Sequence, residues 1–188
     1  MTWLSRHKDG RHFPVGGKAH LPPKHFTKRN PTPSGSGKSS HEVMVEELDK
    51  YSFRKINDAA KLLKLTPTEL GIGTVSLGLS KDLEVAGGTI EGGDPTIIFN
   101  KAFIRSHPKE VIAVVLSHEL SHMKHGHTWI GDHYKVRGKK KKIDIEREKT
   151  AWRFARENTK GVEDITINPD GTAVVTVKKG KKLIAYAV

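Results

Sequence analysis

Residues 108–127 have the sequence PKEVIAVVLSHELSHMKHGH, and this stretch decides the fold of the chain. The segment Val111–Leu116 is almost continuously apolar, which is typical of a helix that packs on more than one side and belongs to the core. Pro108 suits a first helical turn, and Gly126 suits a helix end. We therefore expect a buried helix over Pro108–His125.

The second half of this predicted helix carries His118, Glu119 and His122 in the pattern H-E-x-x-H. An α-helix turns about 100° per residue, so two histidines four residues apart lie one above the other on the same face. Both imidazoles can then bind one metal ion, while the glutamate can reach a water on the metal without being a ligand. Histidines at the end of a buried helix need partners, and a metal supplies one. The pattern predicts a metallohydrolase site with Glu119 as general base.

The composition excludes several classes of protein. The chain has 188 residues, a formal net charge of +12 and no cysteine. Disulfides, thiolate-bound zinc, iron–sulfur clusters and a thiol nucleophile are therefore excluded. No window approaches about 18 consecutive apolar residues, and the first residues lack the apolar core of a signal peptide. We expect a cytoplasmic protein that does not span a membrane.

The positive charge is concentrated in three clusters. Residues 1–38 carry eight Lys or Arg against one Asp, and further basic clusters lie in residues 135–142 and 178–182. Such clusters bind nucleic-acid phosphates or acidic proteins, or they serve only solubility. The second cluster is the one beside the predicted metal site in the sequence, so it is the one placed to steer a substrate.

The chain divides into two segments of different character. Residues 1–40 are rich in Pro, Gly, Ser and Lys and lack an apolar period, which predicts a disordered basic arm. Residues 41–188 predict one α+β domain with a core over residues 95–158 and a C-terminal β-hairpin in residues 162–188. In chain order we expect a helix over Glu42–Leu65, strands over Thr74–Leu79, Leu83–Ile90 and Thr96–Phe99, the helix described above, a basic loop over residues 127–142, a helix over Ile143–Asn158, and tail strands over Asp164–Asn168, Thr172–Lys178 and Leu183–Val188.

A catalytic zinc site needs a third protein ligand and one open position. In the helix after the basic loop, Glu148 shares one stripe with Ile145, Trp152 and Ala155, so it is a carboxylate on an otherwise apolar face. A carboxylate is unfavourable there unless a positive group meets it. Glu148 is therefore the candidate third ligand. An ordinary ion pair with the adjacent Arg or Lys is the alternative.

These two segments resemble a known family. HELSHMKHGH over residues 118–127, followed by EKTAWRFA over residues 148–155, is similar to the gluzincin metallopeptidases. The closest similarity is to the ImmA/IrrE-like and minigluzincin branch, with a more distant one to the HtpX-type proteases. The resemblance covers about residues 95–158 and implies a zincin-like fold, in which a small mixed sheet lies beside the H-E-x-x-H helix and a later helix carries the glutamate ligand. It also implies that Thr96–Phe99 is the edge strand that binds extended substrate, and that one Zn²⁺ is held by His118, His122 and Glu148.

The resemblance has one departure, at Trp152. The family has Asp or Asn at this position, and that side chain accepts the second N–H of a ligand histidine. A tryptophan side chain can only donate a hydrogen bond. Either Asp132, Asp144 or a backbone carbonyl takes over the role of acceptor, or the site binds metal less tightly.

The motif and the resemblance together predict a zinc-dependent endopeptidase that acts on a protein or peptide substrate. Zinc would lower the pKa of its water toward about 7, and Glu119 would accept the proton and hand it to the leaving amine. Such sites usually have a second donor to the developing oxyanion. The candidates from the following loop are His127, His133, Tyr134 and Arg137.

The sequence is also compatible with other functions. A DNA-associated metalloprotease resembling the SprT/Spartan group would use His133 as third ligand and the basic clusters to hold DNA. The absence of cysteine counts against the zinc ribbon often found in that group. A weaker variant uses Asp132 as third ligand. A non-enzymatic nucleic-acid or partner-binding module, encoded by a phage or mobile element, would keep only a structural or decayed metal site.

Overall fold

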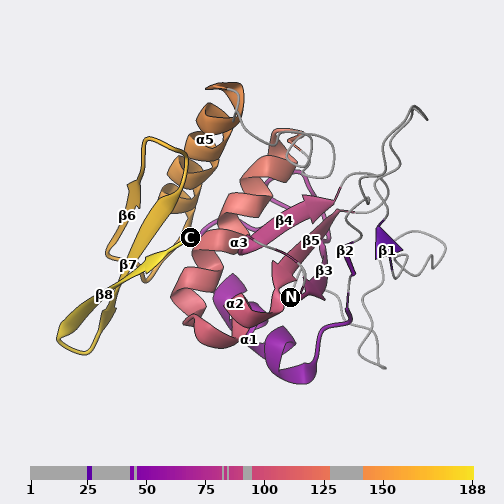
Figure 1. Cartoon of the computed structure of the whole chain (residues 1–188), viewed down its shortest axis with the longest axis horizontal. Coiled ribbons are helices and arrows are strands. Elements are labelled where there is room, and N and C mark those ends of the chain that lie inside the picture. The colour runs from indigo at the N-terminus through magenta and orange to yellow at the C-terminus, as the bar shows by residue number, and fades with distance from the viewer. Residues whose placement is uncertain are drawn as a thin grey trace, which may run out of the picture.

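The computed structural model describes residues 46–81, 83, 85–90, 95–127 and 142–188, together with two short strands near the N-terminus. These residues form helices and small sheets in a mixed arrangement, which confirms the predicted α+β class (Figure 1). The elements are β1 (His25–Phe26), β2 (Val43–Met44), α1 (Lys50–Ala60), β3 (Ser76–Ser80), β4 (Gly87–Ile90), β5 (Thr96–Asn100), α2 (Lys101–Ser106), α3 (Lys109–Lys124), α5 (Lys142–Asn158), β6 (Asp164–Ile167), β7 (Ala173–Lys179) and β8 (Lys182–Ala187).

Helix α3 is the centre of this structure. Every residue from Val111 to His122 is buried, so neighbouring elements enclose the helix on all sides. α1 and α5 pack along it, and the β3–β5–β4 sheet and the C-terminal sheet lie at its two sides in Figure 1. Gly126, with φ +65°, follows its end, as predicted from the sequence. No helix in the described part of the chain has the length and apolar content needed to cross a bilayer.

Strand β5 lies in the middle of its sheet. It pairs in parallel with β3 and antiparallel with β4, so the strand order is β3–β5–β4. The expectation that Thr96–Phe99 is the edge strand is therefore wrong, because strand neighbours are set by pairing between distant segments. The edge beside α3 is β4. A Cβ atom added at Gly87 would lie 3.1 Å from Cγ1 of Val115, so glycine permits this close approach.

The first helix is shorter than the sequence predicts. α1 begins at Lys50 rather than at Glu42, because the Asp49 side chain caps it by accepting a hydrogen bond from the Ser52 backbone N–H at 2.7 Å. The segment before it is extended: β2 pairs with β1, and Glu46 pairs with Leu79. Two later segments also differ from the prediction. The strand expected over Leu83–Ile90 begins only at Gly87, as β4, and the short helix α2, which was not predicted, directly follows β5.

Most of the residues predicted to form the basic arm lie outside the described part of the chain. Within residues 1–40 the structure describes His25–Phe26, which form β1. The expected basic loop is described only at its two ends, at His127 and Lys142. Of the three basic clusters, only the one in residues 178–182 lies fully within the described part of the chain.

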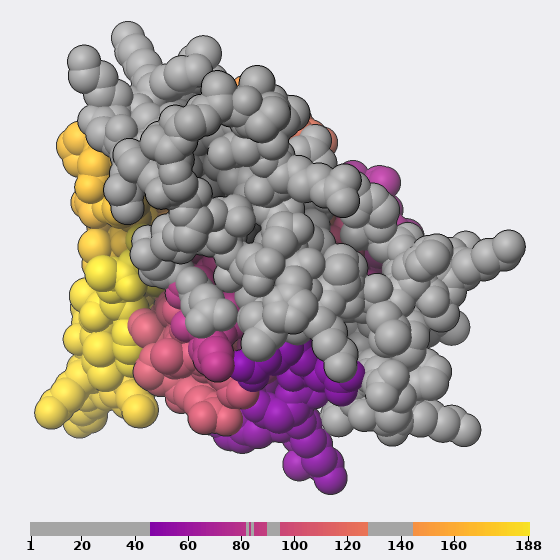
Figure 2. Space-filling model, turned by 45° about the vertical axis from the view of Figure 1, so that its right-hand side comes forward, coloured from indigo at the N-terminus to yellow at the C-terminus, as the bar shows by residue number. Residues whose placement is uncertain are grey.

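The C-terminal segment forms a three-stranded antiparallel sheet, β6–β7–β8, in which β8 corresponds to the strand predicted over Leu183–Val188 and extends the predicted hairpin. Ile165, Ala173 and Val175 point into the core that the sheet shares with α3 and α5. The β7–β8 turn projects from the body of the molecule (Figures 1 and 2). Its lysines in residues 178–182 are exposed. Near the other end of β8, the rings of Tyr186 and His107 lie 5.5 Å apart, which places the tail against the start of α3.

Candidate metal centre

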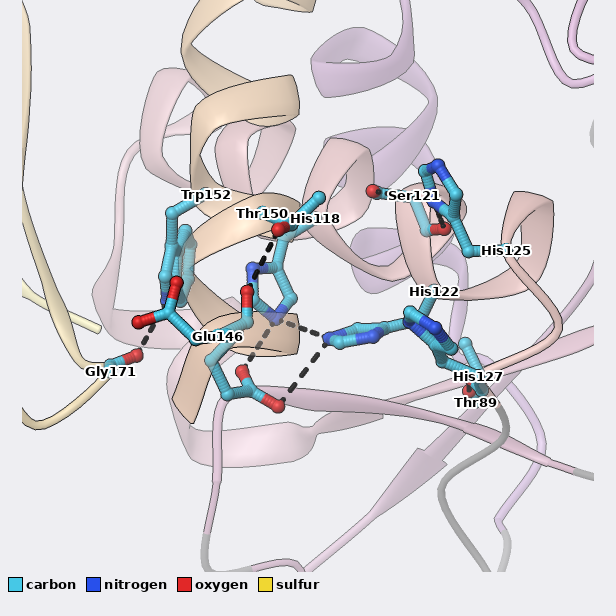
Figure 3. A network of polar contacts seen from close by, with 11 residues as sticks. Thr89, His118, Ser121, His122, His125, His127, Glu146, Thr150, Trp152 and Gly171 are labelled. Carbon is cyan, nitrogen blue, oxygen red and sulfur yellow. Dashed lines mark hydrogen bonds and ion pairs between the residues drawn. The ribbon is translucent and has the colours of Figure 1, made fainter. Parts of the chain in front are cut away.

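Three side chains from two helices converge beside the second half of α3. His118 and His122 lie one turn apart on α3, and their Nε2 atoms are 2.9 Å apart. Glu148 comes from α5, which packs alongside. Its Oε2 lies 3.1 Å from Nε2 of His118, and its Oε1 lies 3.5 Å from Nε2 of His122. Figure 3 shows the two imidazoles turned toward one another.

This donor set suits a metal ion. In a tetrahedral site with bonds of about 2.0–2.1 Å, neighbouring donor atoms lie about 3.3 Å apart. The separations of 2.9 Å, 3.1 Å and 3.5 Å in the structure are close to that value. His118 and His122 are only 4% and 8% exposed. Within the described ranges, His118, His122 and Glu148 are the His, Cys, Asp and Glu side chains whose donor atoms gather this closely.

Electrostatic interactions keep Glu148 ionised. Burial alone would raise the pKa of Glu148, but hydrogen bonds with His118 and His122 outweigh it and hold the pKa well below its usual range. Burial likewise acts to lower the pKa of His122, but the hydrogen bond with Glu148 and the charge of Glu119 raise it above the ordinary value. A metal ion requires neutral imidazoles, so metal binding here would release protons.

Glu119 lies outside this group of three and faces β4. It is 5% exposed, and a Cβ atom added at Gly87 would lie 3.5 Å from its Oε1. Burial raises the pKa of Glu119 to about 7, with the charge of Glu148 adding to the effect and His122 opposing it. A carboxyl group with a pKa near neutrality can both accept and release a proton at physiological pH.

The buried stripe expected on α5 is present. Ala151, Trp152 and Ala155 are 1%, 5% and 0% exposed, and they hold α5 against the core with Glu148 directed toward α3. On the other face Glu146 is exposed and pairs with Lys149 at 3.2 Å. Glu148 therefore meets the two histidines of α3.

Trp152 contacts His118, one of the candidate ligands, through its ring. Its indole packs against the imidazole of His118 with ring centroids 3.7 Å apart, and its Nε1–H donates to the carbonyl oxygen of Gly171 at 3.0 Å (Figure 3). The sequence identified Trp152 as a donor that cannot accept from histidine, but it gave no sign of the contact with Gly171. Asp132 and the side chain of Asp144, the expected replacements, lie outside the described residues.

Among the four candidate oxyanion donors, the structure describes His127. Its backbone N–H donates to the carbonyl of His122 at 2.8 Å, and the two rings lie 5.9 Å apart. Burial lowers the pKa of His127, and the positive charge of Arg147 adds to this effect. The ring is thus neutral at pH 7 and can donate one N–H. His133, Tyr134 and Arg137 lie in the undescribed loop.

The charge of Arg147 beside this site was not predicted from the sequence. Its positive charge adds to the lowering of the pKa of His127 and opposes the rise in the pKa of His122. The sequence offered one indication of this charge, namely that Arg147 directly precedes the candidate ligand Glu148.

Comparison with known proteins adds no assignment, since no family model, no curated protein and no solved structure matches the chain.

Proposed function

We propose that the protein is a zinc-dependent endopeptidase of the gluzincin type. The observation that carries this proposal is the convergence of His118, His122 and Glu148 next to a buried carboxylate, Glu119, that is not one of the three. Two histidines and a glutamate with a fourth position left open are a donor set that zinc uses in hydrolases. When bound, zinc acts as a Lewis acid that lowers the pKa of a coordinated water and polarises the substrate carbonyl.

Glu119 carries the proton in this proposal. It accepts a proton from the attacking water and returns it to the nitrogen of the leaving amine. Its burial supports both steps, because a pKa of about 7 makes uptake and release comparably favourable at neutral pH. His127, whose ring lies 5.9 Å from that of His122, would donate to the carbonyl oxygen as negative charge develops on it.

Strand β4 supports an extended peptide as the substrate. It ends its sheet on the side next to α3, and it passes Glu119 at Gly87. An extended chain can add to such an edge through main-chain hydrogen bonds. The hydroxyl of Thr89 donates to the carbonyl of His127 at 3.5 Å, which joins this edge to the end of α3. We therefore propose that β4, and not Thr96–Phe99 as expected from the sequence, binds the substrate.

A peptidase assay with the zinc-loaded full chain tests the proposal. We expect cleavage of a denatured protein, loss of cleavage on chelation, and recovery when zinc is restored. Glu119→Gln should keep one zinc per chain but lower kcat/KM by about 10²–10⁴-fold, the usual contribution of a general base. Glu146→Gln, which changes an exposed glutamate on α5, is the matched control and should behave as the wild type.

Two results would count against the proposal. Cleavage that survives chelation would remove the metal from the reaction. A Glu119→Gln variant as active as the wild type would remove Glu119 from the role of general base.

A further inference from the structure

The C-terminal sheet reaches the metal centre through the turn between β6 and β7, formed by residues 168–171. Gly171, at the end of this turn, is buried, and its carbonyl oxygen accepts the Nε1–H of Trp152 at 3.0 Å. Trp152 in turn packs on His118, with ring centroids 3.7 Å apart. One backbone carbonyl of the tail is therefore linked to a metal-ligating histidine through a single side chain.

The same turn contacts the third ligand. Gly171 has φ +90°, and a Cβ atom added to it would lie 3.3 Å from Cβ of Glu148 and 3.6 Å from Cα of Ile145. The turn thus lies directly against α5, at the backbone of Ile145 and the side chain of Glu148, and a side chain at Gly171 would require Glu148 to shift by a few tenths of an ångström. A displacement of the turn would be passed to Glu148 by direct contact.

Internal hydrogen bonds make this turn a fixed support. The backbone N–H of Gly171 donates to the carbonyl of Asn168 at 3.1 Å, and that of Asn168 donates to the carbonyl of Thr172 at 2.8 Å. Oδ1 of Asp170 accepts from the Thr172 backbone N–H at 3.0 Å and from its hydroxyl at 2.7 Å. Buried residues of β6 and β7, such as Ile165 and Ala173, anchor the flanking strands in the core.

We infer that the β6–β7 turn positions two of the metal ligands, His118 through Trp152 and Glu148 through Gly171, so that the C-terminal sheet is part of the metal centre. Trp152 and Gly171 are positioning residues, and neither is itself a ligand. A packed indole restrains the plane of the His118 ring by contact, which is the restraint that a hydrogen-bond acceptor gives in other metal sites. The inference rests on the metal centre of the proposed function, but it does not require that the protein cleave peptides.

The size of the effect follows from the precision that a metal site demands. Ligand atoms must be held within about 0.5 Å of their working positions by the groups that surround them. Loss of such a supporting group typically weakens metal binding by about 10–100-fold. Zinc affinity is therefore the quantity in which the role of the turn should appear.

Two glycines of the same sheet provide a matched pair of variants. Gly171 and Gly180 both adopt positive φ in turns, at +90° and +63°, so an alanine strains the backbone at either position. Only at Gly171 would the new Cβ meet Glu148, because nothing lies within 4 Å of a Cβ added at Gly180. We expect Gly171→Ala to lower zinc affinity by about tenfold or more. Gly180→Ala should lower thermal stability alone.

Substitutions of Trp152 test the second contact. Trp152→Phe keeps an aromatic ring beside His118 but loses the hydrogen bond to Gly171, whereas Trp152→Leu loses both. Zinc affinity should be lower in Trp152→Phe than in the wild type and lowest in Trp152→Leu, where the loss should reach about 100-fold. Phe103→Leu is the control, since Phe103 is a buried aromatic residue that stacks on His107 instead of on a ligand. It should lower stability and leave zinc affinity unchanged.

The experiment measures zinc affinity of the full chain by competition with a chromogenic chelator, and records the visible absorption bands of the Co²⁺-substituted protein. A purely structural role would leave the bands of the folded variants unchanged, whereas we expect Gly171→Ala and Trp152→Phe to shift them. Wild-type affinity and wild-type bands in both variants would overturn the inference. If the wild type binds no zinc, the metal centre itself is refuted and the inference falls with it. If zinc binding responds as expected but no peptide is cleaved, the inference stands and the peptidase proposal fails.

Discussion

The two helices that supply the proposed metal ligands are held in place by different means. α3 is buried at every position from Val111 to His122, so the core itself fixes its two histidines. α5 buries one stripe, and its other faces carry charged residues such as Glu146 and Arg153, which are exposed. Its candidate ligand, Glu148, is held between α3 and the β6–β7 turn. One site therefore depends on two sources of order, the hydrophobic core and the C-terminal sheet.

Removing one candidate ligand from either helix should lower zinc affinity strongly, whichever way that helix is held in place. His122→Ala on α3 and Glu148→Ala on α5 each leave two donors. Zinc affinity should therefore fall further than the roughly 10–100-fold caused by losing a residue that only supports a ligand. The measurement is zinc content per chain after dialysis. His133→Ala is the control and should keep its zinc. Loss of zinc in His133→Ala with retention in Glu148→Ala would instead favour a third histidine ligand.

Substitutions away from the ligands should separate the two helices. Leu116 on α3 is 0% exposed, and Leu116→Ala should lower the free energy of unfolding by about 2–5 kcal/mol through lost burial and a new cavity. Arg153→Ala on the exposed face of α5 should change it by less than about 0.5 kcal/mol. Urea denaturation of the metal-free protein measures both. Equal effects would mean that the core does not hold α3 more firmly than α5.

The pH dependence of stability should differ between the metal-free and zinc-loaded protein. The pKa of Glu119 is raised from 4.5 to about 7, so the folded state retains a proton that the unfolded chain releases. The corresponding stability is present at low pH and is lost as pH rises through 7, and the raised pKa of His122 acts in the same direction above about 6.5. From about pH 5 to 8 the metal-free protein should lose on the order of 1–3 kcal/mol. The lowered pKa of Glu148 has the opposite sign, and its contribution is lost only as pH falls below about 4.5.

Zinc should reverse this trend. Binding displaces protons from the histidines, so the stabilisation that zinc confers grows as pH rises. Thermal unfolding of both forms across this pH range gives the comparison. Glu119→Gln is the control, because it removes most of the slope of the metal-free protein. A metal-free protein that becomes more stable from pH 5 to 8 would contradict the assignment of raised pKa values to Glu119 and His122.

Local patterns predicted the parts of the molecule that local burial determines. The continuous apolar run from Val111 to Leu116 predicted α3, and the single carboxylate on the stripe of α5 singled out Glu148. The tail strands predicted over Asp164–Asn168 and Thr172–Lys178 are present as β6 and β7. The features that the sequence did not predict depend on contacts between residues far apart in the chain. The central position of β5 follows from its pairing with β3 and β4, and the contact of Trp152 with Gly171 joins a helix to a turn 19 residues later. No local period encodes such contacts.

X-ray absorption at the zinc edge of the loaded full-length protein tests the three-ligand centre most directly. We predict a shell of nitrogen and oxygen ligands at about 2.0–2.1 Å, with scattering from two imidazoles and not three. In Glu148→Ala that shell should be altered or the zinc lost. A spectrum with three imidazoles, or a zinc shell that is unchanged when Glu148 is replaced, would contradict a centre built from His118, His122 and Glu148.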